Sequence, residues 1–198
     1  TLPDDAAALI KLGALCCDGK VDIVDGKEVH TGDSTETAIV AAMCKIFKTD
    51  KETLDNTNPR MCEIPFDSDR KLMTTVCMID SKPYAIIKGG ADIIIDRSEN
   101  VNKEEVQKAA ELMAADALRV LGIAIKPLEE VPTNPTVEEL ENNLTFIGLV
   151  GLIDPPREEA KAAIRQCKNA GITPVMITGD HVITAAAIAK QLGILTGD

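Results

Sequence analysis

The chain has 198 residues, 45% of them hydrophobic, with a formal net charge of −11. This composition is ordinary for a globular protein, but the acidic balance argues against sequence-independent binding of nucleic acid and against attraction to an anionic membrane surface. No stretch reaches the roughly 18 apolar residues that cross a bilayer, and the N-terminal residues lack the basic segment of a signal peptide. We therefore expect a soluble piece whose six cysteines are free thiols in a reducing compartment.

Two helices are expected in the first fifty residues. Apolar residues recur at helical spacing over residues 4–17, and the following Asp18-Gly19 is a stop or turn signal. A second helix is expected to begin at Asp33 or Ser34, because either side chain can cap exposed backbone amides. Glu36 would lie in the first turn of that helix, where the helix dipole favours a negative charge.

The sequence then predicts an antiparallel meander between residues 61 and 88. Three short segments rich in β-formers, MCEIPF, KLMTTVCMI and PYAIIK, are separated by the turn signals DSDR and DSKP. A helix is expected over residues 102–118 and a strand over 119–125. The first part of the chain is therefore predicted to be an α+β domain with an antiparallel sheet and flanking helices.

A second domain is expected after the Pro- and Glu-rich residues 127–141. Apolar strands (TFIGLVGLI, TPVMI) alternate there with helices (REEAKAAIRQCKNAG, VITAAAIAKQLG), which is typical of a parallel sheet covered on both faces. Two strands are too few to complete such a sheet. We therefore divide the chain into residues 1–141 and an incomplete α/β segment over residues 142–198.

Polar residues follow both strands of the second segment. Thr178, Gly179 and Asp180 stand between a predicted strand and a helix, where an α/β sheet binds ligands and the helix amides can meet a phosphate. Asp154, followed by Pro-Pro-Arg, ends the neighbouring strand. Both features are equally compatible with plain structure: a capped turn in the first case and a rigid strand-to-helix joint in the second.

The first domain contains two candidate ligand-contacting segments. Phe66 is followed by polar residues, an arrangement suited to stacking on a nucleobase with Lys71 available for phosphate, although a core phenylalanine at a strand end is the structural alternative. Lys88-Gly89-Gly90 places a cation at a strand end before a permissive loop, which suits an anion or a purine edge. No Walker or Rossmann fingerprint is present, and Lys88-Gly89 alone is a weak signal.

Taken together, six motifs resemble the P-type ATPases, and within them the type 2 calcium and sodium-potassium pumps. In chain order these motifs are GDSTETA at Gly32, FDSDRKLM at Phe66, KGGAD at Lys88, LRVLGIA around Arg119, DPPR at Asp154 and MITGD with TAxAIAK from Met176 to Lys190.

The resemblance implies a nucleotide-binding (N) domain followed by part of a phosphorylation (P) domain of the haloacid dehalogenase kind. In the N domain, Phe66 would stack on adenine, Glu36 would face the adenine amino group, and Lys71 and Lys88 would line the pocket, with Gly89 behind Lys88. The remaining expected contacts are Arg119 to the phosphates, Thr178, Gly179 and Asp180 to the terminal phosphate and Mg²⁺, and Asp154 on the hinge and nucleotide side.

The same resemblance implies a parent protein that uses ATP and Mg²⁺ to drive cation transport, calcium being the expected ion. This chain would be a cytoplasmic-side domain of that membrane protein, with the transmembrane, actuator and remaining P-domain parts as its partners. It contains no DKTGT, whose aspartate accepts the phosphoryl group, and no GDGxNDxPAL. We therefore expect no catalytic residue, no metal-ligand set and no turnover in the chain itself.

Two departures from the family pattern keep other functions open. Ser68 stands where many calcium pumps have an arginine, and KGGAD replaces the commoner KGAPE. An interaction module that does not bind nucleotide is therefore one alternative. A soluble phosphatase of the dehalogenase type is another, but it would require an aspartate nucleophile in a DxDxT-like segment, which the sequence lacks.

Overall fold

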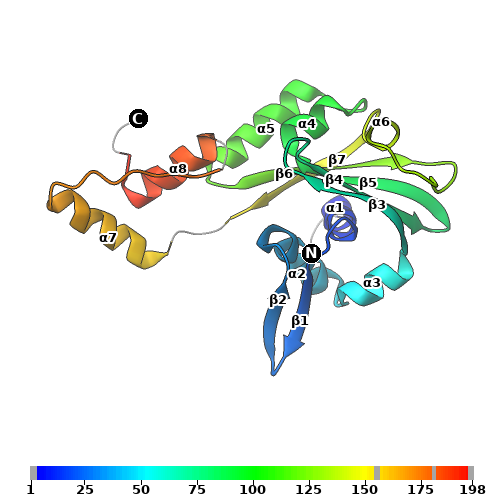
Figure 1. Ribbon diagram of the computed structural model, residues 1–198, viewed down its shortest axis with the longest axis horizontal. Coiled ribbons are helices and arrows are strands. Elements are labelled where there is room, and N and C mark those ends of the chain that lie inside the picture. The colour runs from blue at the N-terminus through cyan, green and yellow to red at the C-terminus, as the bar shows by residue number, and fades with distance from the viewer. Residues whose placement is uncertain (1–3, 154–156, 180–181, 196–198) are drawn as a thin grey trace. The chain divides into compact units, whose positions relative to one another are not determined.

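The computed structural model describes residues 4–153, 157–179 and 182–195 (Figure 1). The chain divides into two compact units. The first consists of Thr1–Val106 and Leu121–Val150, and the second of Gln107–Val120 and Gly151–Asp198. Within the described ranges, no helix has both the length and the apolar character that crossing a membrane requires.

Helices and strands alternate irregularly along the chain. The elements up to residue 90 are α1 (Asp4–Leu15), β1 (Lys20–Val24), β2 (Lys27–Thr31), α2 (Ser34–Phe47), α3 (Lys51–Thr57), β3 (Arg60–Asp67), β4 (Leu72–Ile79) and β5 (Lys82–Gly90). The elements after it are α4 (Ala91–Asp96), α5 (Lys103–Ala115), β6 (Arg119–Pro127), α6 (Val137–Leu140), β7 (Thr145–Leu152), α7 (Glu158–Asn169) and α8 (Val182–Leu192).

The first unit is built on a five-stranded sheet with the order β3-β4-β5-β6-β7. The pairs β3/β4, β4/β5 and β5/β6 are antiparallel, so the predicted meander and the strand after it are confirmed. The predicted start of the second helix is confirmed as well. Asp33 is the N-cap of α2, and its Oδ1 accepts hydrogen bonds from the amides of Thr35 at 2.8 Å and Glu36 at 3.4 Å.

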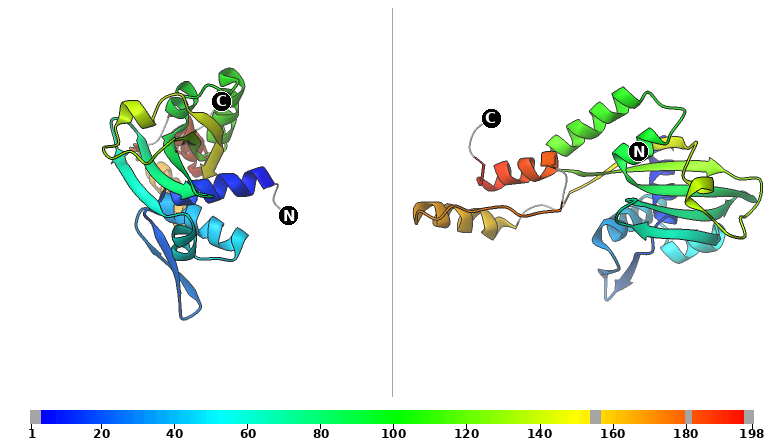
Figure 2. Two further views of the ribbon diagram at one scale, coloured as in Figure 1. Left: turned by 90° about the vertical axis from the view of Figure 1, so that its right-hand side faces the viewer. Right: turned by 45° about the horizontal axis from the view of Figure 1, so that its top comes forward.

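Helices cover both faces of this sheet (Figures 1 and 2). On one face lie α1 and α2, and Gly13 of α1 leaves room for Ile39 of α2 and Ile123 of β6, which a Cβ at Gly13 would meet at 3.3 and 3.5 Å. On the other face, Ile94 of α4 and Leu140 of α6 complete a buried cluster with apolar residues of β4, β5 and β6. Each large aliphatic side chain buried in this way contributes about 1.5–3 kcal/mol to folding.

A buried carboxylate fixes the chain after α6 to the first unit. Glu141 is 0% exposed, and its Oε1 accepts hydrogen bonds from Arg70 Nε at 3.0 Å and Thr74 Oγ1 at 2.9 Å. Arg97 donates to Glu141 Oε2 at 3.1 Å and to its carbonyl oxygen at 3.2 Å. These donors compensate for the cost of burying the charge. The domain boundary expected near Glu141 stays a prediction, while the residue itself is an anchor.

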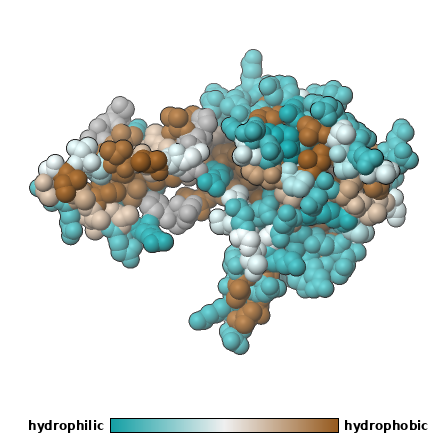
Figure 3. Space-filling model, in the orientation of Figure 1, coloured by the Kyte–Doolittle hydropathy of each residue, from teal (hydrophilic) through white to brown (hydrophobic). Residues whose placement is uncertain are grey.

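An exposed hairpin, which the sequence patterns did not predict, connects the first two helices. Among the residues that the structure describes, β1 and β2 pair only with each other, and every residue of the two strands except Val21 is exposed. Asp25 and Gly26 at its turn both have positive φ, as a two-residue type I′ turn requires. Figure 3 shows apolar surface near the hairpin tip, where Ile23 and Val24 are 69% and 52% exposed.

The second unit differs from the expected alternation of strands and helices. The two predicted helices are present as α7 and α8. The first predicted strand is present as β7, but it adds to the sheet of the first unit, next to β6. Residues 172–178, expected to contain the strand TPVMI, have no regular secondary structure. This strand prediction is wrong for the structure, because a parallel strand needs neighbouring strands for its backbone hydrogen bonds.

Candidate functional site

The strand register brings predicted residues of the first unit to one end of the sheet. Asp67 pairs with Leu72, and Leu72 pairs with Gly89, so these three positions form a row across β3, β4 and β5. Three of the predicted site residues directly precede the residues of this row: Phe66, Lys71 and Lys88. An aromatic ring and two cations from three separate segments therefore lie at the same end of the sheet.

Phe66 presents its ring to solvent. It is 61% exposed, so the alternative that it is a core phenylalanine is wrong. The polar turn that follows explains this exposure, since Asp67 Oδ1 accepts hydrogen bonds from the amides of Asp69 at 3.1 Å and Arg70 at 2.8 Å and ends the strand. An exposed ring beside a polar turn can stack on a planar ligand.

Lys71 stands at the end of this turn with an exposed side chain and a left-handed backbone, with φ of 57°. Its amide donates to the carbonyl oxygen of Asp67 at 2.6 Å, and its own carbonyl accepts from the amide of Gly90 at 3.1 Å. This carbonyl lies so close to β5 that a Cβ at Gly89 would overlap it. The glycine is therefore needed for the close approach of the turn to the strand.

Lys88 is buried and paired with Glu36. Its Nζ lies 2.6 Å from Glu36 Oε1 and 3.3 Å from Cys17 Sγ, and the residue is only 6% exposed. The other carboxylate oxygen, Glu36 Oε2, accepts hydrogen bonds from the amides of Asp18 at 2.7 Å and Gly19 at 3.0 Å. Glu36 thus joins the loop after α1, the first turn of α2 and strand β5.

The role expected for Glu36, facing an adenine amino group, stays a prediction. Three donors already contact its carboxylate. A carboxylate has about four lone-pair sites, so one can still accept a hydrogen bond from a ligand. The geometry also gives Glu36 a second task, which is to hold Lys88 in place.

The surroundings of Lys88 keep its ammonium group charged. Burial disfavours the charge, but the Glu36 carboxylate, which accepts a hydrogen bond from Lys88 Nζ at 2.6 Å, favours it, and the pKa of Lys88 is raised above its ordinary value. Burial also raises the pKa of the Cys17 thiol from 9.0 to about 12, although Lys88 acts in the opposite direction. At neutral pH the pocket therefore contains a charged lysine and a neutral thiol.

The raised pKa of Cys17 predicts a loss of stability in alkali. Above pH 9 the unfolded thiol ionises while the folded thiol stays protonated, so the free energy of unfolding falls as the pH rises from 9 towards 12. We expect Cys17 to contribute about 2 kcal/mol of this fall between pH 8 and pH 10.5. Urea unfolding with reductant should show the fall for the wild type and a smaller one for Cys17→Ala. Cys167→Ala in α7 is the control; equal falls in all three proteins would contradict the assignment.

The predicted residues of the second unit are exposed or lie outside the described ranges. Arg119 begins β6 and is exposed, and Thr178 and Gly179 are exposed residues of the segment before α8. Asp154 and Asp180 lie outside the described residues. Within the described part of the chain, no three His, Cys, Asp or Glu side chains are grouped to hold a metal ion. The roles of these second-unit residues stay predictions.

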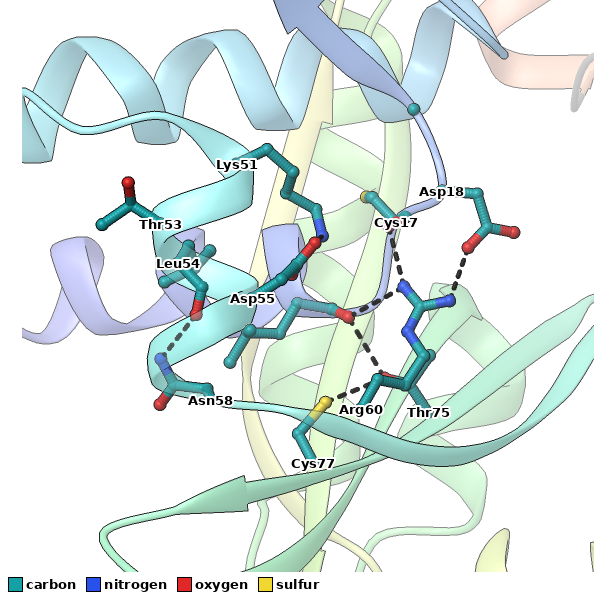
Figure 4. A network of polar contacts seen from close by, with 12 residues as sticks. Cys17, Asp18, Lys51, Thr53, Leu54, Asp55, Asn58, Arg60, Thr75 and Cys77 are labelled. Carbon is teal, nitrogen blue, oxygen red and sulfur yellow. Dashed lines mark hydrogen bonds and ion pairs between the residues drawn. The ribbon is translucent and has the colours of Figure 1, made fainter.

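A network around Arg60 supports the site and was missed by the sequence patterns (Figure 4). The Arg60 guanidinium contacts Asp18 and the carbonyl oxygen of Cys17, next to the loop that binds Glu36. Arg60 and Cys17 also line an open pocket of about 180 Å³, together with Lys51 and Asp55, which form an ion pair. No short motif signals this network, because Arg60 and Asp18 are 42 residues apart.

Comparisons with known proteins give one consistent family. The family described as "P-type ATPase, cytoplasmic domain N" matches residues 5–159. The "Calcium-transporting ATPase 1" of Bacillus cereus is 42% identical over 94% of this chain and 22% of its own length. A "Probable cation-transporting P-type ATPase" of Mycoplasma genitalium is 46% identical over 85% of this chain and 19% of its length.

A eukaryotic relative, named as a sodium/potassium exporting P-type ATPase of Schizosaccharomyces pombe, is 36% identical over 97% of this chain and 20% of its own length. The chain thus spans about a fifth of the length of the curated relatives it matches.

Proposed function

The chain belongs to the P-type ATPase family, and on this basis we propose that its first unit binds ATP at the end of the five-stranded sheet. The observation that carries the proposal is the gathering of an exposed aromatic ring and two lysines at one sheet end. A stacking ring and scattered cations are sufficient when the protein's task is to position a nucleotide and neutralise its charge.

Each residue of this site has a proposed role. Phe66 stacks on the adenine, and the exposed Lys71 contacts phosphate oxygens. Lys88 provides a fixed positive charge inside the pocket, where Glu36 keeps it oriented at 2.6 Å. Gly89 lets the turn that bears Lys71 approach β5.

Residues 142–198, as part of a dehalogenase-like P domain, are proposed to act together with Arg119 of the N domain at the phosphate end of the nucleotide. Arg119 would contact phosphates, Thr178, Gly179 and Asp180 would approach the terminal phosphate and its Mg²⁺, and Asp154 would support the nucleotide side. The exposure of Arg119 and Thr178 is compatible with these contacts.

We further propose that the parent protein transfers the terminal phosphoryl group of ATP to an aspartate outside this chain and thereby drives cation transport. Calcium is the proposed cation, because several of the similar relatives are named calcium-transporting ATPases. The first unit would then stand on the cytoplasmic side of the membrane.

Other parts of the parent are the proposed partners of the second unit. Its apolar side chains are unusually exposed: Val175 is 79% exposed, Ile177 94% and Val182 77%. Exposed apolar side chains of this size favour a covering surface, since burying each contributes about 1.5–3 kcal/mol. The remainder of the P domain is the surface we propose.

Calorimetric or NMR titration of the 198-residue chain with ATP tests the nucleotide site. We expect a dissociation constant in the sub-millimolar to millimolar range and weaker binding by Phe66→Ala, because base–aromatic stacking contributes about 1–3 kcal/mol, or roughly 5- to 150-fold in affinity. Phe47→Ala is the matched control, since Phe47 is also exposed (40%) but ends α2. Lys71→Ala should weaken binding, and the effect should shrink at high salt.

The outcomes separate the candidate functions. Equal affinities of the wild type, Phe66→Ala and Phe47→Ala would contradict the proposed site. Absence of detectable binding at high millimolar ATP would favour an interaction module, and turnover of an aryl phosphate would favour a phosphatase. Lys88→Ala is less suitable as a first test, because it leaves the half-buried Glu36 without its charged partner and lowers stability as well.

A further inference from the structure

We propose that Arg60 is a positioning residue for the nucleotide site: it fixes the loop of residues 17–19, whose amides hold Glu36 and, through Glu36, Lys88. This inference rests on the proposed function and adds a residue on β3 whose guanidinium has no direct contact with Glu36 or Lys88 among the hydrogen bonds of the described residues. Its evidence is a set of hydrogen bonds that join Arg60 to the loop, the loop to Glu36, and Glu36 to Lys88.

The first step is the hold of Arg60 on the end of α1. Its Nη2 donates to the carbonyl oxygens of Leu15 at 3.3 Å and Cys17 at 2.8 Å, and its Nη1 lies 2.5 Å from Asp18 Oδ1 and 2.7 Å from Glu63 Oε2. The last carbonyls of a helix have no intrahelical donor, so a guanidinium is a favourable partner for them. Figure 4 shows Arg60 directed at Cys17 and Asp18.

In the second step, the same loop binds Glu36 through backbone hydrogen bonds. The carbonyl oxygen of Cys17 accepts from Arg60, while the next two amides, of Asp18 and Gly19, donate to Glu36 Oε2. The two sides of one short segment are therefore bonded to two different charged groups. The loop also packs tightly on α2, since a Cβ at Gly19 would lie 2.9 Å from Thr37 Cγ2.

The third step is from Glu36 to Lys88. Glu36 Oε1 lies 2.6 Å from Lys88 Nζ, and the ammonium is enclosed, with 7% of the Lys88 side chain exposed. If the loop moves, Glu36 loses two of the donors that orient it, and Lys88 loses its fixed partner. The position of the pocket lysine thus depends on an arginine at the start of β3.

Arginine is specifically suited to this task. Its planar fork reaches two carbonyl oxygens and two carboxylates at once, whereas a lysine ammonium is a compact point charge that cannot span the same acceptors. Arg60→Lys therefore keeps the charge and removes the geometry. The control is Arg97→Lys, because Arg97 has a similar side-chain exposure (28% against 24%) but is paired with Glu141.

Two measurements on the 198-residue chain test the inference: ATP affinity by titration, and amide hydrogen exchange of Asp18 and Gly19 by NMR. Arg60→Lys should weaken ATP binding about 3- to 10-fold, as expected for the loss of one or two hydrogen bonds. It should also accelerate exchange of both amides about 10-fold or more. Arg97→Lys should leave both quantities unchanged, and Phe66→Ala should weaken ATP binding without altering the exchange.

Each result decides the matter. Unchanged amide exchange in Arg60→Lys overturns the inference, whatever its ATP affinity. If the wild type binds ATP, faster exchange in Arg60→Lys without a loss of ATP affinity overturns it as well. If the wild type does not bind ATP, the proposed function fails. In that case the exchange rates alone test whether Arg60 fixes the loop. Faster exchange of the Asp18 and Gly19 amides in Arg60→Lys, but not in the other variants, would support that structural role.

Discussion

Replacing Glu141 with alanine is expected to lower the free energy of unfolding by about 3–5 kcal/mol, because removing one partner of a buried charge cluster leaves the other charges uncompensated. The carboxylate is 0% exposed and contacts both Arg70 and Arg97. The side chains of Arg70 and Arg97 are only 15% and 28% exposed, so water cannot fully replace the carboxylate as their partner. Urea unfolding monitored by circular dichroism measures the effect.

Glu138→Ala is the matched control for this prediction. Glu138 lies in helix α6, whose C-cap is Glu141, but its side chain is exposed, so we expect a change below about 0.5 kcal/mol. Glu141→Gln should lie between the two, because the amide retains an acceptor for Thr74 or an arginine but loses the charge. A loss of less than about 1 kcal/mol in Glu141→Ala would contradict this prediction, because the cluster would then orient its side chains without stabilising the fold.

Gly89→Ala is expected to cost about 2–3 kcal/mol and to abolish ATP binding, because a Cβ there would overlap a backbone oxygen that cannot rotate away. The overlapped atom is the Lys71 carbonyl oxygen, which also accepts the amide of Gly90. Relief of the overlap must therefore displace the turn that presents Phe66 and Lys71. Thermal unfolding and ATP titration of the same variant would measure both effects.

The neighbouring Gly90 provides the control. A Cβ at Gly90 would meet Asp92 Oδ1 at 2.9 Å, and this is the end of a side chain that can turn aside. We expect Gly90→Ala to cost less than about 1 kcal/mol and to retain ATP binding. Equal losses in the two variants would contradict the importance of the approach of the turn to β5.

Short sequence patterns predicted the strands, turns and helix caps whose structure depends on neighbouring residues in the chain. The meander between residues 61 and 88 was predictable because its strands combine β-formers with polar turns, and Asp33 was predictable as an N-cap because its side chain acts on the next amides. The hairpin of β1 and β2 was not predicted, although Asp25-Gly26 is a hairpin turn signal and Val21 and Ile23 alternate with polar residues. Its strands are almost wholly exposed.

Features that depend on distant partners were not predictable. Glu141 stands in a Pro- and Glu-rich stretch typical of a linker, and its partners Arg70 and Arg97 are 71 and 44 residues away. The strand prediction at residues 173–177 was wrong for the same kind of reason. A strand needs neighbouring strands for its backbone hydrogen bonds, and in the part of the chain that the structure describes none pairs with these residues. In the candidate site, Phe66, Lys71 and Lys88 were expected from the sequence and their nucleotide contacts stay predictions, but the hydrogen bonds that orient Lys88 were not expected.

The base of the β1–β2 hairpin adjoins both chain segments that orient Glu36 in the proposed nucleotide site. Strand β1 begins at Lys20, directly after the two amides that bind Glu36, and β2 ends at Thr31, just before the cap of the helix that bears Glu36. Lys20 and Thr31 are paired at its base. A displacement of this exposed hairpin would therefore move both segments that orient the Glu36 carboxylate in the proposed nucleotide site.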